Sequence, residues 1–126
     1  MLSITEEIKA ETALSEIITK AILSKAASII RKPENWTRGT FAKDKNDEQV
    51  SPEDPTATKC CIMGALRKAR EELNIPIGNY TRKAEVKIET VLIGKGLTPV
   101  LPEFNDDPKT THEDVIHILK ETIAKY

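Results

Sequence analysis

Aromatic side chains are scarce in this sequence, and neither sign of charge is in excess. Of the 126 residues only 4 % are aromatic, and 19 basic residues stand against 20 acidic ones, a net charge of −1. A surface that stacks single-stranded nucleic acid needs several aromatic rings, and a DNA or RNA polymer is attracted by a basic field. The sequence therefore predicts no nucleic-acid polymer as a partner.

Long apolar runs and cysteines are equally few. No run approaches the roughly 20 apolar residues that cross a bilayer, and the first residues lack the basic and apolar regions of a secretory signal. Cys60 and Cys61 are adjacent, and vicinal cysteines rarely bridge each other because the geometry is strained. We therefore expect a cytoplasmic protein with two free thiols, no membrane segment and no zinc site or other cofactor.

What the chain does contain is a helical pattern. Apolar residues make up 39 % and charged residues 31 %, which is typical of a globular domain, and the length suits one core. Ser3 and Glu6 form a capping box, after which apolar residues recur at helical spacing until Pro33 ends the segment. We expect one long helix here, or two helices joined near Thr12.

Further helices are predicted along the rest of the chain. Capping and proline signals favour a helix over about residues 55–73 and another from about 78 to 93. Residues 97–108 are rich in proline and are expected to be irregular, whereas Thr111 and Asp114 cap the closing helix.

Residues 36–52 depart from the helical period. Thr40 to Ala42 and Gln49 to Val50 are short extended candidates around a polar turn, so a small hairpin or an ordered loop fits this segment. The predicted fold is thus mainly α. It is a single compact domain, residues 1–126, of four to five helices with a small β-hairpin or ordered loop at residues 36–52.

The only tryptophan opens this polar segment. Trp36 is most simply a packing anchor, as a lone tryptophan usually is. However, Arg38 and Lys43 place positive charge near it, and the ring of Trp36 or Phe41 offers a flat face for a planar anion. The alternative to a packing role is a binding site for an anionic, nucleotide-like ligand.

A second polar pair precedes the closing helix. Asn105 and Asp106 either tie their segment to a neighbouring helix end or stand at the rim of a pocket. Asp106 and Asp107 offer two carboxylates, but no third ligand is placed beside them, so no metal site is predicted. We expect the 36–44 loop and the 104–106 turn to lie side by side around one pocket. The predicted ligand-binding residues are Trp36, Arg38, Phe41, Lys43, Asn105 and Asp106.

A glycine and a cysteine share the segment that follows residue 60. A glycine within a helix costs roughly 1 kcal/mol relative to alanine, so Gly64 indicates that a neighbouring helix or a ligand approaches closely. With His112 or His117 as a base, Cys61 would be the nucleophile of a cysteine enzyme. Yet a helix that begins at residue 55 puts Cys61 about two turns in, where the helix dipole is weak. We therefore predict a structural Cys61 and no catalytic residue.

Together these segments resemble a family of small uncharacterised bacterial and phage proteins, a domain of unknown function. Its motifs are W-x-x-G-x-F-A-[RK]-D, C-x-x-G-A-L and [WF]-N-D-x4-T-x3-V. The matching residues are Trp36, Gly39, Phe41, Ala42, Lys43, Asp44, Cys61, Gly64, Ala65, Leu66, Phe104, Asn105, Asp106, Thr111 and Val115. Cys60 stands where an aromatic residue is expected. The resemblance covers about residues 13–125 and implies a compact, mainly helical domain, often encoded by mobile or viral genomes.

Two classes of function remain. The first is a non-enzymatic binding protein of phage or mobile-element origin, which sequesters a small anionic ligand or binds a host protein. The second is a cysteine-dependent hydrolase or transferase that uses Cys61. We favour the first, because no complete catalytic set is present. The apolar excess on the long first helix also permits a homodimer.

Overall fold

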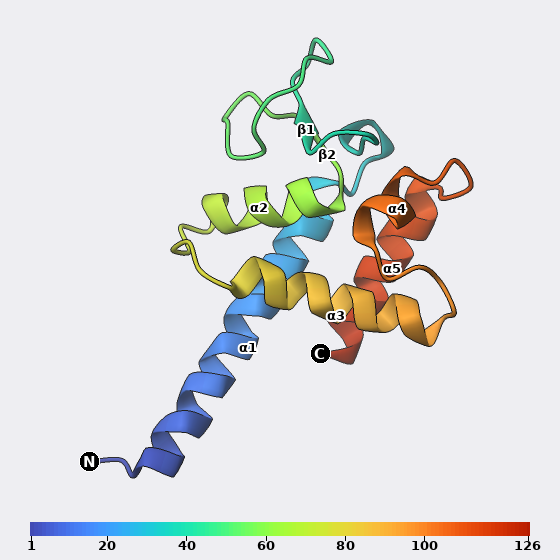
Figure 1. Ribbon diagram of the computed structural model, residues 1–126. Helices are drawn as coiled ribbons and strands as arrows, with labels where there is room; N and C mark the ends of the chain where they lie inside the picture. Colours follow the sequence, from blue (N-terminus) through green and yellow to red (C-terminus); the bar gives the residue numbers. More distant parts are fainter.

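The computed structural model describes residues 1–126 and is mainly α, as predicted (Figure 1). Its elements are α1 (Ile4–Ile29), the 3-10 turn η1 (Pro33–Asn35), β1 (Ala42–Lys43), β2 (Lys59–Cys60), α2 (Ile62–Glu72), α3 (Tyr80–Gly94), α4 (Leu101–Asp106) and α5 (His112–Lys125). None of these helices has both the length and the apolar character that a span of the bilayer requires.

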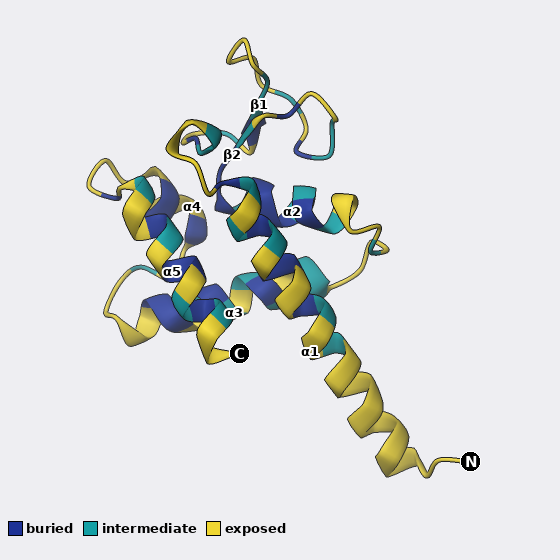
Figure 2. Cartoon of the chain, turned by 180° about the vertical axis from the view of Figure 1, so that it is seen from behind, coloured by how far each residue is buried: buried dark blue, intermediate teal, exposed yellow.

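Helix α1 is one continuous helix, with no break at Thr12. The predicted capping box is present: Ser3 Oγ accepts the N–H of Glu6 at 3.1 Å, and the Glu6 carboxylate accepts the N–H of Ser3 at 3.2 Å. Only the second half of α1 enters the body of the protein. Residues 4–14 are exposed on every side and project as an arm (Figures 1 and 2).

The core forms where the second half of α1 packs against α2, α3 and α5, with α3 and α5 also in contact. Each of these helices contributes one apolar stripe to a single buried cluster, seen as the dark face of each helix in Figure 2. Its fully buried members include Ile22, Leu23, Ile62, Leu66, Ile88, Leu92, Val115 and Leu119.

The expected loop with a small β element is present between η1 and α2. Strands β1 and β2 pair antiparallel, with Ala42 opposite Cys60 and Lys43 opposite Lys59. Gln49 makes only an isolated bridge to Lys43. The residues expected to complete a tight hairpin thus lie beside β1, but the strand partner comes from residues 59–60.

Helix α2 begins at Ile62, so the predicted start at residue 55 is wrong. The Asp54 carboxylate accepts hydrogen bonds from both the N–H and the hydroxyl of Thr56, which closes a turn in place of a helix. Thr58 N–H then donates to the carbonyl of Lys43, and β2 follows. Pairing with β1 therefore overrides the local capping signal.

Helix α4 lies within the stretch that we expected to be irregular. Pro102 sits in its first turn, where a missing N–H costs no helical hydrogen bond. Leu101 and Phe104 are buried in the core, so tertiary packing stabilises this short helix. The helix matters because it carries Asn105 and Asp106 toward the loop.

Gly64 occupies the first turn of α2, against the backbone of the loop. A Cβ at this position would lie 2.0 Å from the carbonyl oxygen of Phe41 and 2.9 Å from its carbonyl carbon. That carbonyl is held in place, since it accepts the N–H of Cys61 at 3.1 Å. The close approach predicted from the sequence is real, but the neighbour is a loop and not a helix or a ligand.

We predict that Gly64→Ala destabilises the protein by about 1–3 kcal/mol, because the added methyl group displaces the Phe41 carbonyl. Gly94→Ala is the matched control. Gly94 is also helical, but a Cβ added there would meet no heavy atom within 4 Å, so alanine should stabilise the protein by up to about 1 kcal/mol. Urea unfolding measures the free energy of unfolding of both variants. If both alanine substitutions change it equally, Gly64 is not closely packed against the Phe41 carbonyl.

Candidate functional site

The side chain of Asn105 joins three segments of the chain. It is 1 % exposed, and its Oδ1 accepts hydrogen bonds from Trp36 Nε1 at 2.8 Å and from the N–H of Ile62 at 3.1 Å. Its Nδ2 donates to the carbonyl of Thr37 at 3.0 Å and to Asp106 Oδ1 at 2.9 Å. The amide is fully engaged, so it fixes the loop, the start of α2 and α4 relative to one another.

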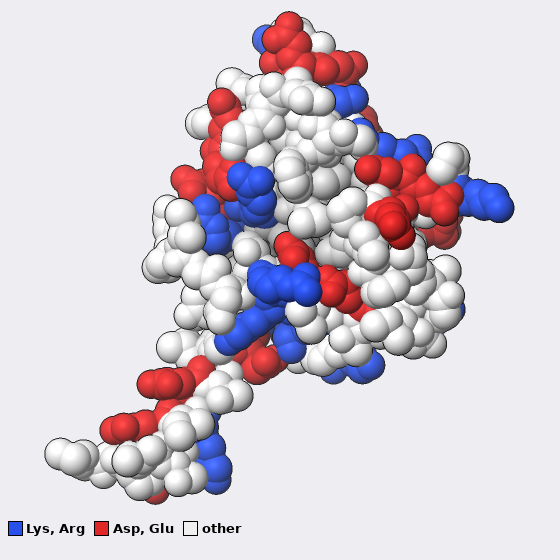
Figure 3. Space-filling view, in the orientation of Figure 1, with Lys and Arg blue, Asp and Glu red and all other residues white.

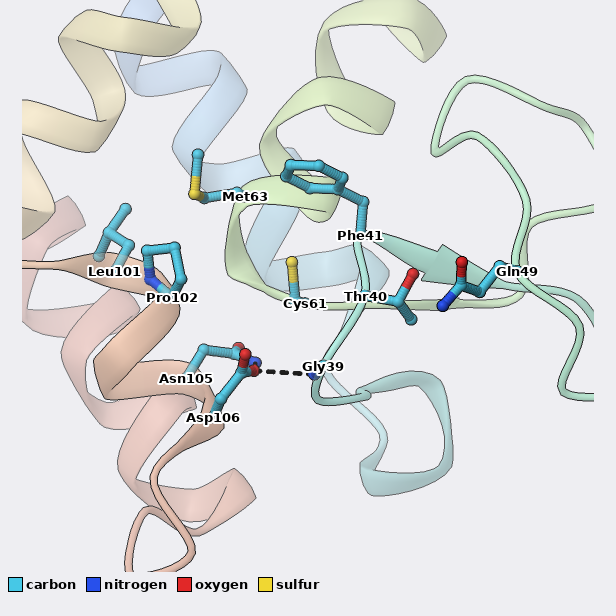
Figure 4. Close-up of a pocket in the computed structure, with 10 residues that line it drawn as sticks. All are labelled: Gly39, Thr40, Phe41, Gln49, Cys61, Met63, Leu101, Pro102, Asn105 and Asp106. Atoms are coloured by element: carbon cyan, nitrogen blue, oxygen red, sulfur yellow. Dashed lines mark hydrogen bonds between the residues drawn. The ribbon is translucent and has the colours of Figure 1, made fainter.

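Asp106 adds a second connection between α4 and the loop. Its Oδ1 accepts the N–H of Gly39 at 3.0 Å, the bond dashed in Figure 4. Gly39 has a φ of 77°, a left-handed conformation that glycine adopts without strain. The expectation that the 36–44 loop and the 104–106 segment lie side by side is therefore confirmed, while the ligand-binding role of their residues stays a prediction.

Arg38 and Trp36 form a stacked pair on the other side of the loop. The Arg38 guanidinium lies 4.5 Å from the centre of the Trp36 ring and donates to the carbonyl of Thr110. The ring of His112 is 6.0 Å from Trp36, and its Nε2 lies 2.7 Å from the carbonyl of Ile30. These contacts fasten the loop to α5 and leave neither side chain free at a cavity.

A cavity of about 340 Å³ opens between the loop, the first turn of α2 and α4 (Figure 4). Four apolar side chains and several polar groups surround it. The lining residues are Gly39, Thr40, Phe41, Gln49, Cys61, Met63, Leu101, Pro102, Asn105 and Asp106. A cavity of this size holds a small organic molecule.

The cavity takes in half of the predicted ligand-binding residues. Phe41, Asn105 and Asp106 line it, whereas Trp36, Arg38 and Lys43 do not. Lys43 lies in β1, where its carbonyl accepts the N–H of Thr58.

Of the other lining residues, Gly39 and Cys61 belong to the motifs found in the sequence, but no local pattern marks the rest. Met63 and Leu101 are ordinary helix and loop residues by their sequence context, and their meeting depends on how α2 and α4 pack.

Cys61 is the N-cap of α2, so its predicted place two turns inside a helix is wrong. Its Sγ accepts the N–H of Gly64 at 3.3 Å and points into the cavity (Figure 4). Burial raises the pKa of this thiol. The N–H groups of Gly64 and Met63 lower it by less than burial raises it, and the carboxylate of Asp106 adds a smaller increase.

The histidines considered as bases lie elsewhere. His112 Nε2 is occupied by the Ile30 carbonyl, and His117 Nε2 lies 2.7 Å from a carboxylate oxygen of Glu121 on the outer face of α5. Cys60 is fully buried, and burial raises its pKa to about 12. The arrangement brings a thiol, a carboxylate and an amide to one cavity, and no histidine lines it.

Comparison with known proteins identifies a family. Residues 15–125 match a family described as "Family of unknown function (DUF6197)". No curated protein and no solved structure matches the chain.

We predict that Asn105→Ala lowers the free energy of unfolding by about 2–4 kcal/mol, because it leaves buried donors and acceptors without partners. Trp36→Phe removes a single donor and should cost about 1 kcal/mol. Asn35 makes no side-chain hydrogen bond, so Asn35→Ala is the control and should change stability by under about 0.5 kcal/mol. Chemical denaturation measures the free energies of unfolding of the three variants. If Asn105→Ala is as stable as the control, the hydrogen bonds of Asn105 do not hold the three segments together.

Proposed function

We propose that this chain, which belongs to the DUF6197 family, is a small non-enzymatic binding protein whose ligand occupies the cavity beside α4. The observation that carries the proposal is the combination of a cavity of ligand size with a rim held by the buried Asn105 amide. A rim that is already ordered loses little conformational entropy when a ligand binds.

The lining defines the chemistry of the ligand. Phe41, Met63, Leu101 and Pro102 form an apolar wall that accepts a hydrocarbon or aromatic group. Asp106 uses one carboxylate oxygen for protein hydrogen bonds, and no donor of the chain reaches the other. We therefore propose a small molecule with an apolar body and a cationic or hydrogen-bond-donating group.

Charge is the reason for preferring this ligand over the anion expected from the sequence. No lysine or arginine lines the cavity. Arg67, which lies 5.2 Å from the ring centre of Phe41, is paired with Glu53 through two hydrogen bonds of 2.8 and 3.0 Å. An anion would meet the Asp106 carboxylate without a cation to offset it.

The surface gives no support to a polymeric ligand. Acidic and basic side chains are intermixed over the body on the face shown in Figure 3, without a broad field of one sign. The two buried free thiols favour a reducing compartment, and we propose the cytoplasm as the place of action. The phage or mobile-element origin expected from the family resemblance stays a prediction.

A cysteine-dependent enzyme is the second candidate, and one observation favours it: the Cys61 thiol faces the cavity from a helix N-cap. We rank the enzyme second because burial raises the pKa of the Cys61 thiol and because neither histidine lines the cavity.

We predict that phenethylamine, an apolar ring with an ammonium group, raises the melting temperature in a concentration-dependent manner, while phenylacetate and AMP do not. Asp106→Asn keeps the acceptor for Gly39 but removes the charge, and it should weaken amine binding by about three- to tenfold. Lys43→Ala is the charge control and should leave amine binding unchanged. Isothermal titration calorimetry measures these constants. If the protein instead binds AMP more tightly than phenethylamine, and Lys43→Ala abolishes AMP binding, the hypothesis of an anionic ligand would be favoured.

We predict that Cys61→Ser folds with at least the stability of the parent chain, since serine is a good N-cap, and that it binds the same amine with an affinity within about twofold. Iodoacetamide should alkylate Cys61 more slowly at about pH 7.5 than it alkylates free cysteine, because the folded thiol has the higher pKa. Rapid alkylation, together with loss of the biological activity in a folded Cys61→Ser protein, would favour the enzyme.

A further inference from the structure

The arm of α1 and the turn that follows it expose apolar side chains that the body does not cover. Ile8, Leu14 and Ile17 are 58 %, 57 % and 66 % exposed. The arm continues a packed helix and has a capping box, but no side chain of the body packs on its exposed turns. Most helical stability in proteins comes from tertiary packing of an apolar face, and a partner would supply that packing here.

The exposed side chains are not spread evenly around the helix. One face of the helix has small and apolar residues separated by four, three and four positions, a spacing that puts them in line along a helix. These residues are Ala10, Leu14, Ile17 and Ala21. This face continues along the body half of α1 through the exposed Ser24 and Ser28, whose small side chains allow another helix to come close. All six of these residues are exposed, so this side of α1 is open to solvent along its length. Ile4 and Ile8 lie on the opposite face, in line with the buried residues.

The charges of α1 are divided between its halves. Residues 1–16 carry Glu6, Glu7, Glu11 and Glu16 against the single Lys9. Residues 17–32 carry Lys20, Lys25, Arg31 and Lys32 and no acidic residue. The helix dipole favours such charges only in the first and last turns, so it does not account for those in the interior.

Not all of these charges are used within the chain. Glu16 pairs with Lys87, and Lys25 pairs with Glu72. Glu7, Glu11 and Lys20 make no ion pair with another residue of the chain. An acidic arm and a basic second half are complementary to each other only when two such helices run in opposite directions.

We infer that α1 pairs antiparallel with α1 of a second copy of this chain, through the face of Ala10, Leu14, Ile17 and Ala21. The spacing of this face is symmetric about the point between residues 15 and 16, so Leu14 of one copy lies opposite Ile17 of the other. Ala10 then lies opposite Ala21, and the acidic arm of each copy runs along the basic half of its partner. The interface is isologous, as a two-fold dimer requires.

Sedimentation equilibrium of the full chain tests the dimer. The parent chain should be dimeric at about 50 μM, and Ile17→Glu should raise the dimer dissociation constant at least about tenfold. Ile8→Glu is the matched control, because Ile8 has a similar exposure in the same arm on the opposite face, and it should change the constant by less than about threefold. A monomeric parent chain overturns the proposal, as does equal dissociation by both variants.

The direction of pairing is tested by distance. The native cysteines are buried, so a spin label attached to Thr5→Cys reports one site per copy. In the antiparallel dimer the two labelled residues are separated by about 21 residues along the axis, or about 31 Å. In a parallel pair they would be about 8–10 Å apart, the distance between packed helix axes. A distance near the second value overturns the antiparallel arrangement.

The charge argument is tested separately. In the proposed register residue 11 of one copy faces residue 20 of the other, so Glu11→Lys sets lysine against lysine there and Lys20→Glu sets glutamate against glutamate. Each variant alone should therefore dimerise at least about threefold more weakly than the parent. An equimolar mixture should form heterodimers with about the parent affinity, because both contacts between positions 11 and 20 then pair a lysine with a glutamate. If the mixture dimerises no more tightly than each variant alone, charge does not contribute to the pairing.

Discussion

The hydrogen bonds of the Asn105 side chain are the constraint on which the candidate site depends. A buried primary amide has two donors and an acceptor oxygen with two lone pairs, and leaving them unpaired costs free energy. Here all are satisfied by groups from the loop, the start of α2 and α4. Few other arrangements of these segments would satisfy the same amide, so one side chain selects their relative positions.

The second constraint is steric and acts on the same junction. With no side chain at Gly64, the carbonyl of Phe41 reaches the first turn of α2 and accepts the N–H of Cys61. This contact sets where β2 ends and where the helix begins. It also makes Cys61 the N-cap and turns its thiol toward the cavity, so backbone packing places a chemically distinctive side chain.

The elements that line the cavity, namely α4, the start of α2 and the loop at β1, lie at the end of the molecule away from the α1 arm (Figure 1). No residue of α1 lines the cavity, so the binding proposal and the dimer proposal rest on different side chains. The family match begins at residue 15, so the arm of residues 4–14 lies before the matched part of the chain. Of the proposed pairing face, Ile17 and Ala21 lie within the matched residues, whereas Ala10 and Leu14 lie before them.

The sequence by itself determined the mainly α class, the capping boxes at Ser3 and Thr111, and the closeness of the loop to Asn105. These follow from local signals and from the placement of special residues at junctions. The tertiary structure alone decided that α2 begins at Ile62, that α4 forms, and that Arg38 stacks on Trp36 away from the cavity. The physical reason is that each of these outcomes depends on long-range partners. Strand pairing competes with a helix cap at Asp54, burial of Phe104 stabilises a helix too short to form alone, and a carbonyl on Thr110 decides where the guanidinium of Arg38 points.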